Sequence, residues 1–157
     1  MGFLKRLFAG FSMPKFAGPA ELIFTLGSGT ADLVTQNARW SNGILEVTVR
    51  SAETCRLVEL TLNDLQQCML GLRFEMSSSE VNKAVYPETW VRVEGFGECF
   101  SKGLNYKLSG TNGWISCELP FYLKANQKAN LLKLNLVFEG AGSASLRNIE
   151  LYSTPLV

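Results

Sequence analysis

The last third of the chain constrains the fold most, because its apolar residues recur at every second position. In the stretch that follows Gly113, apolar side chains stand at Ile115, Cys117, Leu119 and Phe121. A second run over residues 132–138 alternates in the same way and ends at the turn-forming triplet 140–142. Successive side chains of a strand point to opposite faces, so both runs are strands with one buried face. This pattern is typical of a β-sandwich.

The rest of the chain repeats the pattern of short strands separated by turn residues. Expected strands span 20–26, 43–50, 54–62, 68–77, 88–95, 114–123, 131–139 and 145–152. Asn42-Gly43 and Asn112-Gly113 predict tight turns, since Asn and Gly tolerate a positive φ. Residues 63–68 fit either a turn or one helical turn capped by Asn63. Eight strands in 157 residues predict one all-β, antiparallel sandwich domain of jelly-roll type over residues 18–157.

Residues 1–17 form a separate amphipathic segment in this interpretation. Its apolar side chains stand at helical spacing before Pro14, at Phe3, Leu4, Leu7, Phe8 and Phe11. The segment is too short and too charged to span a bilayer or to serve as a secretory signal. It predicts a short helix that either lies on a membrane or partner surface or covers an open end of its own sandwich. We favour the second, covering an open end of the sandwich, because the two cations Lys5 and Arg6 give little attraction to an anionic membrane surface.

Composition excludes several classes of function. The net charge is only +1, which argues against nucleic acid as a partner. The chain has no histidine, so the commonest general base and the commonest metal ligand are missing. Asp32 and Asp64 are its only aspartates, too few for a local calcium loop, although a calcium ion held mainly by backbone carbonyls is conceivable. We expect no metal site, no cofactor and no enzymatic activity.

The four cysteines, Cys55, Cys68, Cys99 and Cys117, have no metal-binding or redox spacing. We expect buried free thiols, with two disulfides as the alternative in an exported protein. The absence of a glycosylation sequon favours a reduced compartment, hence a cytoplasmic protein, with peripheral membrane contact through the N-terminal segment as a further option.

Alternation also predicts which side chains point away from the core. Residues 70–76, 91–93 and 132–138 place their Leu, Phe, Met and Val side chains inward at every second position. The opposite positions carry Arg73, Glu75, Trp90, Arg92, Glu94, Lys133 and Asn135. If the three strands are neighbours, these side chains form one face with planar donors, carboxylate acceptors and an indole, the chemistry that sugar recognition requires. The alternative is a solvated face of cross-strand ion pairs.

Aromatic residues outside these strands are the second group of candidates. Trp40 and Trp114 stand beside predicted turns, and Tyr86 and Tyr106 in predicted loops, where sandwiches often bind ligands. A Trp in this place is more commonly a lid over the core. The longest irregular stretch is expected at 96–111, with Phe96, Phe100 and Leu104 anchoring it to the core.

A glycosidase-like carboxylate pair, Glu75 with Glu94, is disfavoured as a catalytic site. A general acid needs a raised pKa, whereas neighbouring arginines lower the pKa of both groups.

The segment Trp114–Phe121, followed by residues 132–138 and 146–151, resembles the closing strands of jelly-roll, galactose-binding-like domains. It looks like the end of non-catalytic carbohydrate-binding modules and is similar to the complex I intermediate-associated protein 30 type domain. The shared positions are core and turn positions, so the resemblance implies the fold and assigns no ligand residue.

Two functions therefore remain open from the sequence. One is a binding module for a glycan or similar polar ligand. The other is an assembly protein that docks to a protein complex, to its own copies or to a membrane surface through the sandwich and the N-terminal helix.

Overall fold

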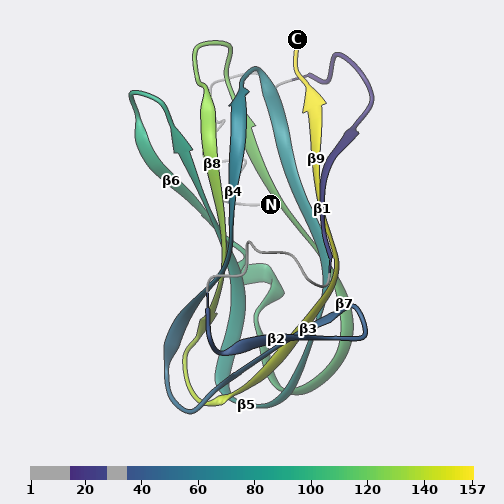
Figure 1. Ribbon diagram of the computed structural model, residues 1–157, viewed down its shortest axis with the longest axis vertical. Coiled ribbons are helices and arrows are strands. Elements are labelled where there is room, and N and C mark those ends of the chain that lie inside the picture. Colours follow the sequence, from purple (N-terminus) through teal and green to yellow (C-terminus); the bar gives the residue numbers. More distant parts are fainter. Residues whose placement is uncertain (1–14, 28–34) are drawn as a thin grey trace.

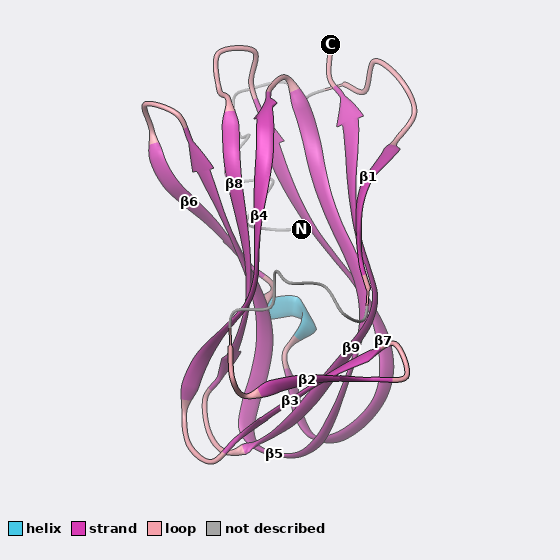
Figure 2. Cartoon of the chain, viewed as in Figure 1, coloured by secondary structure: helices cyan, strands magenta, loops and turns pink. Residues whose placement is uncertain are grey.

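The structure is a computed structural model that describes residues 15–27 and 35–157. The helix expected at the N-terminus, with its contact residues Phe3, Leu4, Leu7, Phe8 and Phe11, lies outside the described residues. The described chain is almost entirely β-structure, and its one helical element is a single 3-10 turn, η1 (Leu104–Tyr106), drawn in cyan in Figure 2.

Nine antiparallel strands make up the described chain. They are β1 (Glu21–Leu26), β2 (Ala38–Ser41), β3 (Ile44–Val49), β4 (Glu53–Leu65), β5 (Cys68–Val93), β6 (Gly97–Lys102), β7 (Leu108–Leu123), β8 (Ala129–Phe138) and β9 (Gly142–Pro155). Their hydrogen bonds form one continuous path that folds over into two layers (Figure 1).

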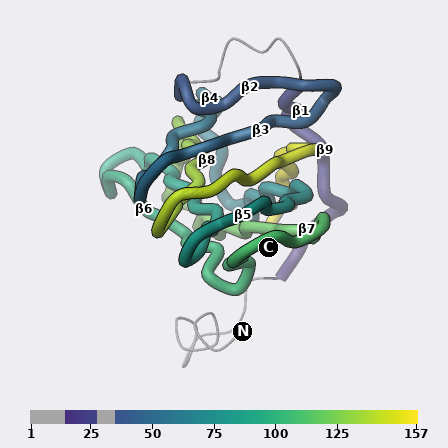
Figure 3. Tube along the Cα trace, turned by 90° about the horizontal axis from the view of Figure 1, so that it is seen from below, coloured from purple at the N-terminus to yellow at the C-terminus, as the bar shows by residue number. Residues whose placement is uncertain are grey.

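Strand β5 is shared by both layers. Its first part, residues 68–79, pairs with β7 on one side and with β9 on the other. The far edge of β9 pairs with β3 and with β1, and β3 pairs with β2. Figure 3 shows β2, β3, β9, β5 and β7 side by side in this order. The second part of β5, residues 85–93, pairs with β6 and β8, and β8 pairs with β4. We call these the Arg73 layer and the Trp90 layer.

The turn in β5 falls at residues 80–83, where the alternation of the sequence is interrupted. Glu80 and Lys83 both have a positive φ, 50° and 70°. The bend is held against the β8–β9 connection, because the Asn82 amide donates to the Ala141 carbonyl at 2.7 Å. One strand thereby supplies outward side chains to two different faces.

The core lies between the layers and confirms the predicted alternation. Leu70, Leu72, Phe74 and Met76 of the Arg73 layer face Val91 and Val93 and the alternate residues of β8, all buried. Burying apolar surface contributes about 25 cal/mol per Å², so this interface is the main source of stability. The antiparallel β-sandwich expected from the sequence is confirmed.

Several local expectations were wrong. The strands expected at 68–77 and 88–95 are one strand, while β2 and β6 were not expected. Asn112 and Gly113 lie within β7 instead of a turn, because the Asn112 amide nitrogen donates to Ser78 Oγ at 3.0 Å and to the Ser109 carbonyl at 2.8 Å. The Asn42-Gly43 turn is confirmed, with φ of 52° and 76°. Residues 63–65 continue β4 without a helical turn.

The stretch 96–111 is also more regular than expected. It contains β6, η1 and the start of β7. Phe96, Phe100 and Leu104 do not anchor it to the core, since each is more than half exposed. Gly103 helps to anchor it, because its backbone amide donates to the Pro87 carbonyl at 2.8 Å. The backbone packs so closely there that a Cβ atom on this residue would clash with its neighbours.

Candidate functional site

The outer surface of the Trp90 layer gathers polar and aromatic side chains from four strands. We define the Trp90 face by its central residues, Arg56 and Glu59 of β4, Lys133 and Asn135 of β8, Glu88, Trp90 and Arg92 of β5, and Glu98, Phe100 and Lys102 of β6. The strand register arranges them in rows across the layer. One row runs Glu59, Lys133, Trp90, Phe100, and the next to it runs Arg56, Asn135, Glu88, Lys102.

An aromatic pair lies at the β5–β6 side of this face. The ring centroids of Trp90 and Phe100 are 5.4 Å apart and their planes are inclined by 36°. Phe100 is 56% exposed, so more than half of its surface faces solvent. Lys102 Nζ lies 5.5 Å from the Phe100 ring centroid. The pair is therefore an apolar platform open to solvent and bordered by a cation.

The Trp90 indole is held in place by Glu88. Indole Nε1 donates to Glu88 Oε1 at 2.6 Å, and Asn135 Nδ2 donates to the same oxygen at 3.2 Å. Glu88 and Asn135 are both buried, and Asn135 Oδ1 accepts no hydrogen bond from the described residues. A buried carbonyl oxygen without a donor costs about 1–3 kcal/mol.

Two cations converge on one carboxylate beside the platform. Lys133 Nζ reaches across β5 to Glu98 Oε1 at 2.7 Å, and Arg92 Nη2 approaches the same oxygen at 3.3 Å. Because β5 separates β8 from β6, the Lys133 side chain crosses β5 to reach Glu98, and it is buried. The hydrogen bond from Lys133 and the second cation lower the pKa of Glu98, which keeps it an ionised acceptor.

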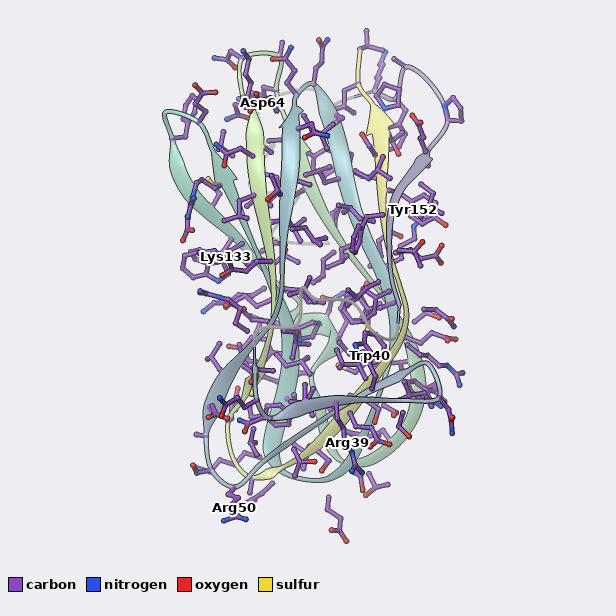
Figure 4. The ribbon with its side chains drawn as sticks, viewed as in Figure 1. Arg39, Trp40, Arg50, Asp64, Lys133 and Tyr152 are labelled. Atoms are coloured by element: carbon purple, nitrogen blue, oxygen red, sulfur yellow. The ribbon has the colours of Figure 1, made fainter. Side chains whose placement is uncertain are left out.

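The remaining sequence candidates do not join this face. Arg73 and Glu75 lie on the outer surface of the Arg73 layer, so the single face expected from alternation is divided between two layers. Glu94 follows the end of β5 and is exposed. The division follows from the bend in β5, which sends its two halves to opposite sides of the molecule. Figure 4 shows this separation in Lys133 beside β8 and Tyr152 beside β9.

Of the four loop candidates, Trp40 lies beside the Asn42-Gly43 turn as expected, whereas Tyr86, Tyr106 and Trp114 lie in regular elements. Tyr86 is buried within β5, and Trp114 lies within β7 with the Arg147 guanidinium 4.0 Å above its ring. Trp40, labelled in Figure 4, lies in β2 and packs against the core as a lid. Tyr106 lies in η1, and its hydroxyl donates to the Glu118 carbonyl at 3.1 Å and accepts from the Glu118 amide at 3.2 Å. None of the four has an open ring face comparable to Phe100.

Sequence reasoning missed six residues of this face: Arg56 and Glu59 of β4, Glu88 of β5, and Glu98, Phe100 and Lys102 of β6. Glu88 could have been found, because it stands two residues before Trp90 and alternation puts both on one face. The three residues of β6 depend on recognising a six-residue edge strand whose single phenylalanine is exposed. Such a strand carries no hydrophobic periodicity.

The thiols of the described residues are free. Cys55, Cys68 and Cys117 are buried, which raises the pKa of Cys55 to about 11 and of Cys117 to about 12, and also raises the pKa of Cys68. In the described ranges no three His, Cys, Asp or Glu side chains converge in a way that would hold a metal ion. No helix there has the length and apolar character needed to cross a membrane.

Solved structures share this architecture, although no family model and no curated protein sequence matches the chain. A family 29 carbohydrate-binding module complexed with mannohexaose has a TM-score of 0.53 and 13% identity over 88% of this chain and 94% of that one. Another structure of that module, complexed with cellohexaose, gives 0.52 and 14% over 87% and 92%. The CBM22-1 xylan-binding domain from Paenibacillus barcinonensis gives 0.51 and 10% over 92% and 87%. The chain thus shares the β-sandwich, jelly-roll fold of these structures.

Proposed function

We propose that the chain is a non-catalytic carbohydrate-binding module whose ligand lies on the Trp90 face. The observation that carries the proposal is the Trp90–Phe100 pair, with Trp90 partly buried and Phe100 exposed, beside the buried Glu88 and Asn135 on the same face. The structural neighbours are carbohydrate-binding modules, which supports the same class of function.

The chemistry of the face suits a polyhydroxyl ligand. The apolar side of a pyranose ring packs on aromatic rings, and its hydroxyl groups both donate and accept hydrogen bonds. The Trp90 face offers an acceptor in Glu98, whose side chain is 30% exposed, and a donor in Arg92, whose side chain is 50% exposed. Cations and carboxylates are nearly balanced on it, so an uncharged sugar fits better than a strongly ionic ligand.

A binding role also agrees better with the carboxylates than hydrolysis does. Glu75 and Glu94, the pair weighed as acid and nucleophile, belong to different layers. The pKa of Glu75 is lowered by hydrogen bonds from Arg147 and Asn148, whereas a general acid needs a raised one.

The proposal is tested by titrating the full chain with mannohexaose and cellohexaose, the ligands of the structural neighbours, in a calorimeter. Trp90→Ala is expected to weaken binding at the Trp90 face at least tenfold, or about 1.4 kcal/mol. Glu88→Gln keeps the size of the side chain and an oxygen that can accept from the indole but removes the charge, so it tests whether that charge matters and is expected to weaken binding less than Trp90→Ala.

Trp114→Ala is the matched control, because Trp114 belongs to the other layer and its ring is already covered by Arg147. It should leave affinity at the Trp90 face within twofold of the wild type. Equal affinity in wild type and Trp90→Ala, with both proteins folded by circular dichroism, would exclude this face as the site.

A further inference from the structure

The Arg73 layer has a hollow on its outer surface, opposite to the Trp90 face. This groove of about 400 Å³ is lined by the side chains of three neighbouring strands and of η1, namely Arg73, Glu75, Tyr106, Glu118, Asn148 and Glu150. The register sets Arg73 between Glu118 and Glu150, so a guanidinium is flanked by two carboxylates in one row. Binding pockets for small molecules have volumes of roughly 300–1,000 Å³.

The Arg73 side chain is fixed in the groove with its terminal nitrogens available. Its guanidinium lies 4.3 Å above the Tyr152 ring, and Nε is 3.5 Å from Glu118 Oε1. The Tyr152 hydroxyl in turn donates to Glu150 Oε2 at 3.1 Å. The two terminal nitrogens of Arg73 donate to no group among the described residues, and the side chain is 43% exposed. A guanidinium held in this way is a preorganised planar donor.

A β-bulge shapes the other end of the groove. The pairing of β5 with β9 shifts between Arg73 and Glu75, and Asn148 within the bulge has a φ of 54°. The side-chain nitrogen Nδ2 of Asn148 donates to Glu75 Oε2 at 2.8 Å, and Arg147 Nε donates to the same oxygen at 2.7 Å. Bulges redirect side chains, and here one adds an amide group to the wall of the groove.

We propose that this groove is a second carbohydrate-binding site, separate from the Trp90 face, that holds one or two sugar units through their hydroxyl groups. Arg73 donates to a pair of neighbouring hydroxyl groups, and Glu118 and Glu150 accept from hydroxyls on either side. Its recognition is mainly polar, because the Tyr106 hydroxyl is already bonded to the Glu118 backbone and the other side chains named above are charged or amide groups. The nearby rings of Tyr152 and Trp114 are covered by arginines. The groove therefore takes a short sugar or the terminal unit of a longer one. The Trp90–Phe100 platform, in contrast, is open on its outer side.

The inference goes beyond the proposed function, because it gives the molecule two sites on opposite outer surfaces. A chain with two sites can hold two strands of a polysaccharide, or bind one polymer with an affinity greater than that of either site alone.

The experiment follows backbone amide resonances of the ¹⁵N-labelled full chain during titration with mannohexaose and with cellohexaose. Two separate groups of shifts are expected with either sugar, one around residues 73–75, 116–118 and 148–150, the other around 88–92, 98–100 and 133–135. Arg73→Met should raise the Kd of the first group at least tenfold and leave that of the second within twofold. Trp90→Ala should do the reverse.

Arg39→Met is the matched control, since Arg39 forms an exposed ion pair with Glu46 on the same layer outside the groove. It should change neither group. Glu118→Gln, which keeps the size of the side chain, gives a second test of the groove if Arg73→Met folds poorly. Shifts confined to the Trp90 group overturn the second site alone, shifts confined to the groove overturn the proposed function alone, and no shifts with either sugar overturn both.

Discussion

At the scale of single residues, Phe100 and Leu134 separate binding from stability. Both lie in the Trp90 layer, but Phe100 points outward and is exposed while Leu134 points into the core. Phe100→Ala should reduce the free energy of unfolding by less than about 1 kcal/mol and weaken glycan binding, because it removes half of the platform. Leu134→Ala should cost about 2–5 kcal/mol through the cavity it leaves. Urea unfolding together with calorimetry measures both effects, and a large loss of stability in Phe100→Ala would contradict this assignment.

The thiols give a second prediction for single residues. A raised pKa means less reactive thiolate, and Cys55, Cys68 and Cys117 are also buried. At pH 8 only the half-buried Cys99 should react quickly with a thiol reagent in the folded protein, and all four should react in urea. Mass spectrometry after brief alkylation identifies the modified position. Rapid labelling of Cys117 in the native state would show that its strand opens.

Glu98 predicts how stability depends on pH. Lys133, and after it Arg92, lower the pKa of Glu98 below 4.5, so its stabilising effect is complete above that value and is lost as the pH falls through the folded pKa. Glu98→Gln lacks this effect at every pH. The stability difference between wild type and variant should therefore shrink between pH 7 and about pH 3. Urea midpoints at the two pH values measure it, and a constant difference would mean that the ion pairs do not contribute.

At the scale of elements, the bend of β5 depends on its contact with the β8–β9 connection. A Cβ atom on Gly140 would lie 2.6 Å from the Asn82 carbonyl oxygen, whereas one on Gly113 would meet nothing within 4 Å. Gly140→Ala should destabilise the protein by about 1–3 kcal/mol, since the backbone must shift. Gly113→Ala, the matched control, should change stability by less than about 1 kcal/mol in either direction. Equal melting temperatures would show that the connection yields easily.

The elements also show where sequence-based prediction succeeds and where it stops. Alternation correctly assigned the inward residues of β5 and β8, because burial of one face is a local pattern. It could not place Arg73 and Trp90 on different layers, since that depends on the bend at residues 80–83. It also missed β6, because Phe100 is exposed and this strand shows no alternating apolar pattern. Three of the ten residues that define the Trp90 face, Glu98, Phe100 and Lys102, come from this strand.

At the scale of the whole molecule, β5 couples the two layers into one unit. It pairs with β7 and β9 in one layer and with β6 and β8 in the other, so separating the layers disrupts a strand on which both depend. Unfolding should therefore be a single cooperative transition. Trp90 and Trp114 report on different layers, which allows a direct test with Trp90→Phe and Trp114→Phe in a background that also carries Trp40→Phe. Fluorescence and far-ultraviolet circular dichroism should give the same urea midpoint within each variant. Two separate midpoints would mean that the layers unfold independently, and the contacts of the β5 bend would then be too weak to join them.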